Sequence, residues 1–162
     1  NGFELCEAAA VPGKEEYLNS EKYEIRHWDL DRPDSLRPLV ALVNRIRREN
    51  RSLQSNDGLS FVSVDNPQLI AYAKRSPDDT NAVLVVVNLD PHHPQSGWVE
   101  LDLARFGISA DDTFQMHDLL SGARYLWHGP RNFVLLDPAR MPAHVFRLRR
   151  RIRREQDFDY FD

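Results

Sequence analysis

The sequence has a single cysteine, Cys6, among its 162 residues. Without a second cysteine, no disulfide can form within the chain and no cluster of thiolates can hold a metal ion. This scarcity favours a reducing, cytoplasmic location. The sequence also has no apolar run of membrane-spanning length, and no charged segment followed by the hydrophobic core of a secretion signal. We therefore expect no membrane partner.

Positive charge is also in deficit: 21 lysine and arginine residues face 25 aspartate and glutamate residues, which gives a formal net charge of −4. This argues against general binding of nucleic acid, because polyanions attract basic proteins. Residues 147–154 are a local exception and are rich in arginine. The strand pattern of residues 144–148 runs into this segment, and acidic residues follow it. We therefore expect a solvated tail or an intersubunit contact here, and no nucleic-acid partner.

Residues 34–54 have the spacing of one amphipathic helix with an arginine-rich outer face. Asp34 is the expected N-cap, and Pro38 falls in the first turn, where its missing N–H is harmless. The apolar positions recur three or four residues apart: Leu36, Leu39, Val40, Val43 and Ile46.

After a turn signal at residues 56–58, the sequence becomes a series of short β-rich runs separated by Pro, Gly, Asn and Asp. The absence of a helical pattern between the runs predicts an antiparallel sandwich or barrel. The predicted domains are residues 1–54, residues 55–150 and a charged tail at residues 151–162. The expected strands are residues 59–64, 68–74, 82–88, 97–101, 113–119, 123–127, 132–136 and 143–148.

Residues 1–54 are too few to enclose a core of their own. No methionine precedes Asn1, and the apolar alternation of residues 1–5 is typical of a strand end. A strand end, an elaborate loop and a helix together form one βα unit of a (β/α)8 TIM barrel, in which the loops after the strands carry the chemistry. We therefore expect the chain to be a piece of a larger enzyme.

Three stretches carry a family resemblance: NGFELCE at residues 1–7, EEYLNSEKYEIR at residues 15–26 and NRIRRENRSLQ at residues 44–54. With the closing β-rich region they resemble the C-terminal part of the α-amylase superfamily, glycoside hydrolase family 13. Within it, the chain is most similar to the α-1,4-glucan:maltose-1-phosphate maltosyltransferases, over about residues 1–150. The fold class that this implies is mixed: the last βα unit of a TIM barrel followed by an all-β antiparallel sandwich of the α-amylase C-terminal type.

The resemblance implies transfer of a maltosyl unit from maltose 1-phosphate to the non-reducing end of an α-1,4-glucan, with retention at the anomeric carbon. Retention needs two carboxyl groups about 5 Å apart, one as nucleophile and one as general acid and base. In the family these carboxylates lie on barrel strands that precede Asn1. The chain is therefore expected to contain no catalytic residue and to be inactive alone. The family needs no metal or organic cofactor, and its active form is a homodimer.

The resemblance assigns substrate binding to Lys22 and Tyr23 within the motif SEKYE. In the family the matching pair hydrogen-bonds the maltosyl unit of the donor, on its far side from the phosphate. A lysine ammonium offers three donors to sugar hydroxyls, and a tyrosine combines a phenolic hydroxyl with an apolar ring face. As isolated residues, Lys22 would be an exposed loop charge and Tyr23 a packing residue.

Two residues near the N-terminus are open to a functional interpretation. Glu4 could line the mouth of the barrel, but a structural carboxylate paired with an arginine of a neighbouring strand is the favoured reading. Cys6 has no cysteine–histidine signature around it, and retaining glycosyl transfer needs no thiol. We expect Cys6 to be a small buried residue.

Two groups of histidine and aspartate residues have side chains that can bind a metal ion, but their spacing does not indicate a metal site. Asp90, His92 and His93 are close in sequence, yet the flanking prolines indicate a turn between strands, so we expect no metal there. The second group, in the loop before the helix, is His27, Asp29 and Asp31. The family resemblance implies that they are entrance or capping residues, and His27 is expected to make a structural hydrogen bond.

Two alternative functions stay open. Exposed aromatic rings stack on sugars, so Trp98, Tyr125 and Trp127 could make the β region a non-catalytic carbohydrate-binding module. Coplanar aromatics on one solvent face would support this, whereas burial in the core would remove it. A trehalose synthase or another amylase-like enzyme is the other alternative, although the last barrel loops of those enzymes differ from SEKYE.

Overall fold

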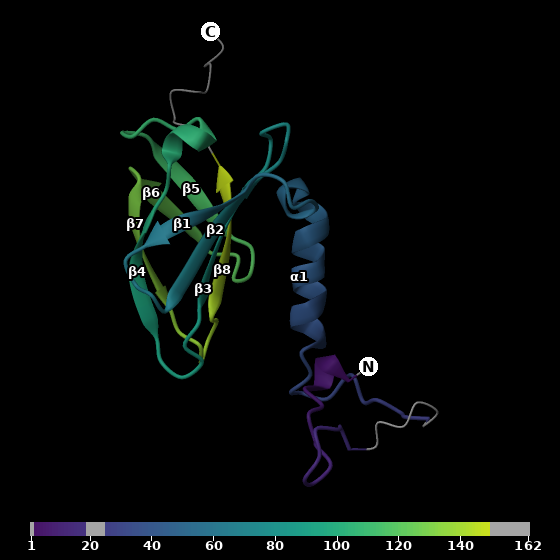
Figure 1. The fold of residues 1–162 in the computed structure, drawn as a ribbon. Helices are drawn as coiled ribbons and strands as arrows, with labels where there is room; N and C mark the ends of the chain where they lie inside the picture. Colours follow the sequence, from purple (N-terminus) through teal and green to yellow (C-terminus); the bar gives the residue numbers. More distant parts are fainter. Residues whose placement is uncertain (1, 19–24, 150–162) are drawn as a thin grey trace. The chain divides into compact units, whose positions relative to one another are not determined.

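The computed structural model describes residues 2–18 and 25–149, and the chain divides into two compact units, residues 1–45 and residues 46–162 (Figure 1). The division falls inside the helix α1, Arg37–Glu49. No helix in the described part of the chain is long and apolar enough to cross a membrane.

Unit 1 opens with a short 3-10 helix, η1, at Phe3–Leu5, so the expected strand end is not formed. Its backbone is satisfied locally instead: the N–H of Leu5 donates to the carbonyl of Gly2 and the N–H of Cys6 to that of Phe3, both at 3.1 Å. A strand would need a neighbouring strand to pair these groups. The turn begins and ends at residues with positive φ, Gly2 at 86° and Cys6 at 53°.

The helix α1 begins at Arg37, two residues later than the expected N-cap at Asp34 implies. Asp34 does not cap it, because the Asp34 carboxylate pairs with Arg32 (Nε to Oδ1, 2.8 Å). The Ser35 hydroxyl accepts the N–H of Arg37 instead, at 3.2 Å. Pro38 lies in the first turn, as predicted. After Glu49 the chain turns into a second 3-10 helix, η2, at Arg51–Leu53, so the predicted single helix is shorter than expected.

The apolar stripe of α1 is covered only near its C-terminal end. Ile46 is buried, whereas Leu39 and Val43 are 40% and 48% exposed. The sequence pattern therefore identified the apolar face correctly, but most of that face has no cover within the described residues.

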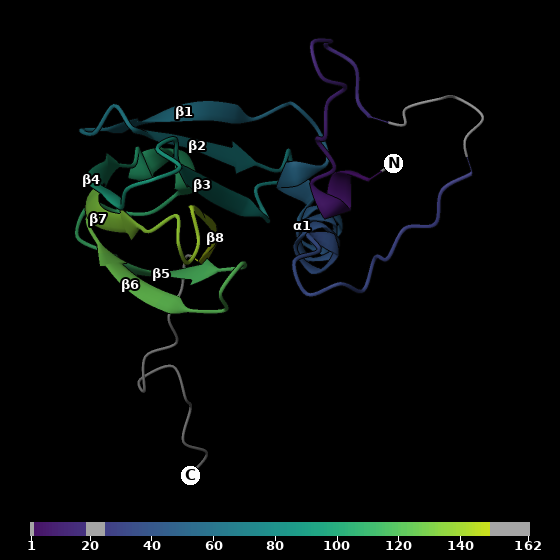
Figure 2. The same cartoon turned by 90° about the horizontal axis from the view of Figure 1, so that it is seen from below.

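Unit 2 contains eight antiparallel strands, and all eight predicted strands are confirmed with ends shifted by at most two residues. They form one curved sheet in the order β6-β5-β8-β3-β2-β1-β4-β7, whose two end strands come near each other (Figure 2). The strands are β1 Leu59–Val64, β2 Leu69–Arg75, β3 Ala82–Asn88, β4 Gln95–Glu100, β5 Thr113–Asp118, β6 Arg124–His128, β7 Arg131–Leu136 and β8 Ala143–Arg149.

The core of unit 2 lies inside this curved sheet. Alternate residues of each strand point inward, and the side chains of Val99, Phe114 and Met116 are fully buried. The central strand β3 differs, because both of its faces are covered: Val83 and Val86, which point to opposite sides, are both buried. The continuous run AVLVVVN is typical of such a strand. The antiparallel all-β prediction is therefore confirmed for unit 2.

A buried amide network joins the end of α1 to the β2–β3 turn. Asn81 Nδ2 donates to Asn50 Oδ1 at 3.0 Å, and Asn81 Oδ1 accepts the Ser52 hydroxyl at 2.6 Å and the Ser52 N–H at 3.2 Å. Asn50 Nδ2 in turn donates to the carbonyl of Ile46 at 2.8 Å. All three polar side chains are buried, so each depends on the others for its hydrogen bonds.

We expect Asn81→Ala to lower the free energy of unfolding of unit 2 by about 1–3 kcal/mol, because Asn50 and Ser52 lose their buried partner. Chemical denaturation of the full chain, followed by tryptophan fluorescence, measures this. Asn56→Ala is the matched control, since Asn56 is exposed and makes no hydrogen bond to the described residues. Equal stability of the two variants would contradict the role given to the network.

Candidate functional site

The two predicted donor-binding residues, Lys22 and Tyr23, lie outside the described residues. The chain on both sides of them is described. Arg26 Nη2 donates a hydrogen bond to the carbonyl of Leu18 at 3.1 Å. This contact joins Leu18, the last residue before the segment 19–24, to Arg26, the second residue after it. Before it, residues 10–17 form a small hairpin with a bridge between Ala10 and Tyr17.

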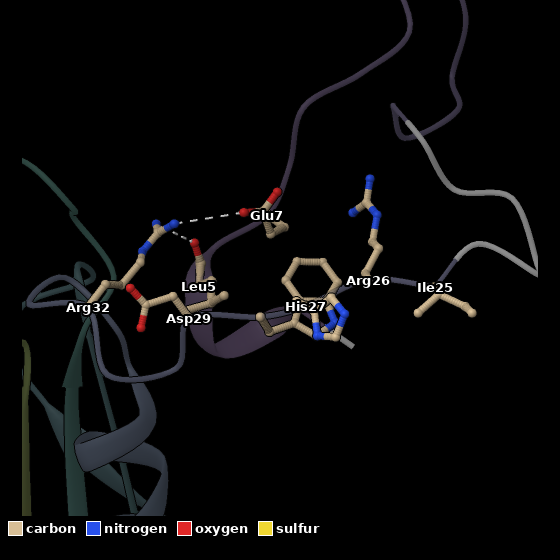
Figure 3. A pocket seen from close by; sticks show the side chains of 8 residues that line it. Leu5, Glu7, Ile25, Arg26, His27, Asp29 and Arg32 are labelled. Carbon is tan, nitrogen blue, oxygen red and sulfur yellow. Dashed lines mark hydrogen bonds and ion pairs between the residues drawn. The ribbon is translucent and has the colours of Figure 1, made fainter.

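A pocket of about 460 Å³ lies in unit 1 next to the end of this segment (Figure 3). The pocket combines carboxylates, guanidinium groups, an imidazole and an indole. Such a surface offers hydrogen-bond donors, acceptors and aromatic area, which suits a hydroxyl-rich ligand. Its lining residues are Leu5, Glu7, Ile25, Arg26, His27, Trp28, Asp29 and Arg32.

Arg32 joins the two sides of the pocket. Its Nη2 donates to the carbonyl of Leu5 at 3.0 Å, and its Nη1 lies 3.8 Å from Glu7 Oε1, as the dashed lines in Figure 3 show. Its Nε lies 2.8 Å from Asp34 Oδ1. One guanidinium group therefore contacts η1, the residues after η1 and the segment that leads into α1. The planar fork of arginine is suited to several such contacts at once.

Arg26 and Trp28 shape the opposite part of the pocket. The guanidinium carbon of Arg26 lies 5.1 Å from the centre of the Trp28 ring, within cation–π range. The neighbouring Ile25 is 87% exposed. Arg26 thus has two roles in the described structure: it covers the indole, and it contacts Leu18 across the segment that carries the predicted donor-binding residues.

The histidine and aspartates of the loop have different surroundings. Asp29 Oδ1 accepts the N–H of Asp31 at 3.2 Å and so caps a turn, and Asp31 Oδ1 pairs with Arg37 Nη1 at 2.7 Å. His27 lines the pocket but makes no hydrogen bond to the residues that the structure describes. Asp29 therefore has a capping role and Asp31 forms an ion pair, whereas the hydrogen bond expected for His27 is not seen among the described residues.

Glu4 lies in η1, and Cys6 follows it. The neighbouring strand whose arginine was expected to pair with Glu4 is not among the described residues, so that reading stays a prediction. The carboxylate of Glu4 makes no ion pair within residues 2–18 and 25–149. Its backbone carbonyl instead accepts the N–H of Leu36 at 2.6 Å. Cys6 is exposed, so the prediction of a buried cysteine is wrong. The physical reason is the turn at η1: Leu5 points inward, and the next residue takes a left-handed conformation that ends the turn.

The aromatic residues of unit 2 do not form the coplanar platform that would support a carbohydrate-binding module. Trp127 is buried in the core, and Tyr125 packs edge-on against Phe146. Trp98 is 42% exposed, but its ring is inclined by 66° to that of Phe133. The guanidinium of Arg131 lies over Trp98, 5.1 Å from the ring centre. These geometries do not favour stacking on a sugar.

Asp90 stabilises a turn. Its Oδ1 accepts the N–H groups of His92 and His93 at 2.8 and 3.1 Å, and its Oδ2 accepts from Gln95 Nε2 at 3.0 Å and contacts His93 Nδ1 at 3.0 Å. These bonds, chiefly the one from the His92 N–H, lower the pKa of Asp90 to about 2. The proline-flanked turn expected from the sequence is therefore present.

Sequence reasoning missed a buried carboxylate in unit 2. Asp118 Oδ2 accepts the Ser121 hydroxyl at 2.5 Å and contacts His144 Nδ1 at 3.0 Å, and Oδ1 accepts the N–H of Val145 at 3.2 Å. Burial alone would raise the pKa of Asp118, but the contacts from His144, from Ser121 and from the N–H of Leu120 lower it. Asp118 is opposite Phe146 on β8. Ser121 is a local partner from the turn after β5, whereas His144 and Val145 reach Asp118 only through the register of β5 with β8, so no local motif could have predicted those two contacts.

The arginine-rich segment is described only as far as Arg149, and residues 150–154 lie outside the described part. Arg147 and Arg149 belong to β8, so the segment begins as a strand. Its role as a tail or an intersubunit contact stays a prediction.

The chain matches known proteins along most of its length. The model of the family described as "GLGE, C-terminal" matches residues 61–148. In fold, the chain is similar to a noncanonic maltogenic α-amylase from Thermotoga neapolitana, with a TM-score of 0.52 and 13% identity, over 68% of this chain and 24% of that one. The fold is thus that of an antiparallel β domain found in an α-amylase structure. The chain belongs to the GLGE C-terminal family.

Two curated relatives carry the name α-1,4-glucan:maltose-1-phosphate maltosyltransferase. The protein of Chlorobaculum tepidum is 47% identical over 90% of this chain, and that of Pseudomonas aeruginosa is 45% identical over 93%. The chain spans 23% of the length of each relative. The similarity includes the loop and helix of unit 1 as well as the β domain.

We expect Arg32→Gln to loosen η1 from the start of α1. The amide of Leu36, which bonds to the carbonyl of Glu4, should exchange its hydrogen about tenfold faster, because loss of the bond to Leu5 weakens the local structure by about 1–2 kcal/mol. Hydrogen exchange followed by NMR measures this. Arg37→Gln is the control, since the Arg37–Asp31 pair is exposed and contributes little. Unchanged exchange in Arg32→Gln would disprove the joining role of Arg32.

Proposed function

We propose that this chain is the C-terminal part of a retaining enzyme that transfers maltosyl units from maltose 1-phosphate to the non-reducing end of α-1,4-glucans. The observation that carries the proposal is the identity of 47% and 45% to two proteins of that name, over at least 90% of this chain. The substrates named here come from those relatives.

In this proposal, the catalytic carboxylates belong to the larger part of the enzyme, outside the chain. Unit 1 would be the last βα unit of a TIM barrel, with α1 as its helix. The exposure of Leu39 and Val43 on α1 and of Phe3 on η1 supports this, since apolar side chains in these positions would pack against neighbouring barrel elements. The domain boundaries at residues 54–55 and 150–151 and a homodimeric, cytoplasmic enzyme are part of the same proposal.

Lys22 and Tyr23 are the proposed donor-binding residues. The described contacts near them support a shaped binding surface: Arg26 reaches across the segment to Leu18, and the pocket of Figure 3 lies beside Ile25. Remote sugar contacts of this kind can increase the rate by holding the donor in place over the nucleophile.

The decisive assay uses the enzyme with its upstream region, maltose 1-phosphate and a short maltooligosaccharide, with glucose 1-phosphate as the control donor. We expect inorganic phosphate to be released from maltose 1-phosphate but not from glucose 1-phosphate. We also expect the acceptor to be lengthened by two glucose units. A folded enzyme that releases no phosphate would shift the assignment to another amylase-like activity.

In the same enzyme, Tyr23→Ala should lower kcat/KM for maltose 1-phosphate by a factor equivalent to about 1–3 kcal/mol, because a sugar contact is lost in the transition state. Tyr17→Ala, in the hairpin of unit 1, is the matched control and should leave kcat/KM near the wild-type value. The rate at limiting donor is the measurement, and an unchanged rate for Tyr23→Ala would refute its assignment.

A further inference from the structure

A row of basic side chains crosses the outer face of β6, β5 and β8 in unit 2. His117 on β5 lies directly opposite Arg124 on β6 and Arg147 on β8. Arg149 lies opposite Gln115, one pair further along the same face. Directly opposed residues in an antiparallel sheet have Cβ atoms about 4.5–5.5 Å apart. We call Arg124, His117, Arg147 and Arg149 the basic row.

The alternation of each strand places the basic row on the outside. On β5, Phe114 and Met116 are buried in the core, so His117 points to the other face. On β8, Phe146 and Leu148 are buried, so the two arginines between and after them point outward. The row is therefore a feature of the surface, and it is separate from the pocket of unit 1.

Within the described residues, the positive charge of the basic row is not balanced by a carboxylate. None of its three arginines makes an ion pair with a carboxylate in the described part of the chain, although Arg32, Arg37 and Arg131 elsewhere all do. Like charges opposite each other destabilise a sheet. In a chain with a net charge of −4, three arginines without a described carboxylate partner on one face form a local surface that attracts anions.

The electrostatics of His117 agree with this geometry. Burial, followed by Arg124, Arg149 and Arg147, lowers its pKa, and these are the charged groups that reach it from β6 and β8. The nearby Asp118 acts in the opposite direction, but its carboxylate points into the core and is already bonded to Ser121. An anion on the outer face would reverse the effect of the arginines and favour the imidazolium form of His117.

We propose that the basic row binds a phosphate group, either as inorganic phosphate or as the phosphate of a sugar monophosphate. A tetrahedral dianion directs its oxygens toward several sides, so arginines from two strands and the histidine between them can each contact it. Guanidinium groups match the geometry of phosphate, and their hydrogen bonds to it are charge-assisted. A single planar carboxylate would leave part of the row uncovered. This proposal does not depend on the proposed enzymatic activity.

The test titrates the full chain with inorganic phosphate at constant ionic strength, balanced with sodium chloride, while NMR follows the imidazole resonances. His117→Gln identifies the His117 signals among the six histidines. The expected result is a saturable shift of those signals, with an apparent affinity about tenfold lower in Arg147→Gln. Arg140→Gln is the matched control, because Arg140 is an exposed arginine at the β7–β8 connection that pairs with Asp137.

Three further arms make the outcome decisive. Arg124→Gln repeats the test on the other side of His117, in case Arg147→Gln does not fold. Glucose 1-phosphate in place of inorganic phosphate distinguishes the two sources. The charge of sulfate does not change over the pH range in which His117 titrates. Sulfate should therefore bind more tightly as the pH falls through the pKa of His117, and in His117→Gln its affinity should no longer depend on pH in this way. A linear shift, an equal shift with chloride, or equal weakening in Arg140→Gln would overturn the proposal.

Discussion

The hydrogen bonds among Asn50, Ser52 and Asn81 are the constraint that fixes the end of α1 and the turn before β3 against each other. A buried amide without partners costs free energy, so the two side chains and Ser52 are satisfied only in one relative position. That position places the end of α1, where Ile46 is buried, against the β2–β3 turn. The exposed Arg51–Asp78 pair, at 2.7 Å, adds a second and weaker contact at the same turn. Within unit 2, a polar network therefore holds the last residues of α1 at the β2–β3 turn.

The strands of unit 2 could be predicted because their signal is local. The β-rich runs and the turn residues between them located all eight strands, whereas the burial of β3 on both faces became visible only in the structure. The predictions that failed concern residues whose polar groups could form their hydrogen bonds or ion pairs in two different ways. Asp34 has the chemistry of an N-cap, but a nearby arginine takes its carboxylate. Residues 3–5 alternate like a strand, but no strand in the described chain pairs with them, and a 3-10 turn satisfies their backbone.

The candidate sites could be predicted only in part, because they depend on contacts between residues far apart in the chain. Arg32 reaches the carbonyl of Leu5, and His144 reaches Asp118, through folding that no spacing rule encodes. The basic row is a clearer case. Arg124, His117 and Arg147 are unremarkable in sequence, and they become neighbours only because the registers of β5 with β6 and with β8 place them opposite one another.

The two units differ in how far they bury their own apolar side chains, and this difference has a functional consequence. Unit 2 closes a core inside its sheet, whereas Leu5 is the only apolar side chain buried among residues 2–18 and 25–45. Burying a side chain such as Leu39 or Val43 stabilises a protein by about 1.5–3 kcal/mol. Because both are partly exposed, unit 1 would gain stability from a partner that covers them. Unit 1 also holds the loop with Lys22 and Tyr23. If other barrel elements supply the cover that α1 lacks, the same packing that stabilises the helix also fixes the loop before it. In the proposed enzyme, the geometry of donor binding would then depend on packing between this chain and the catalytic part.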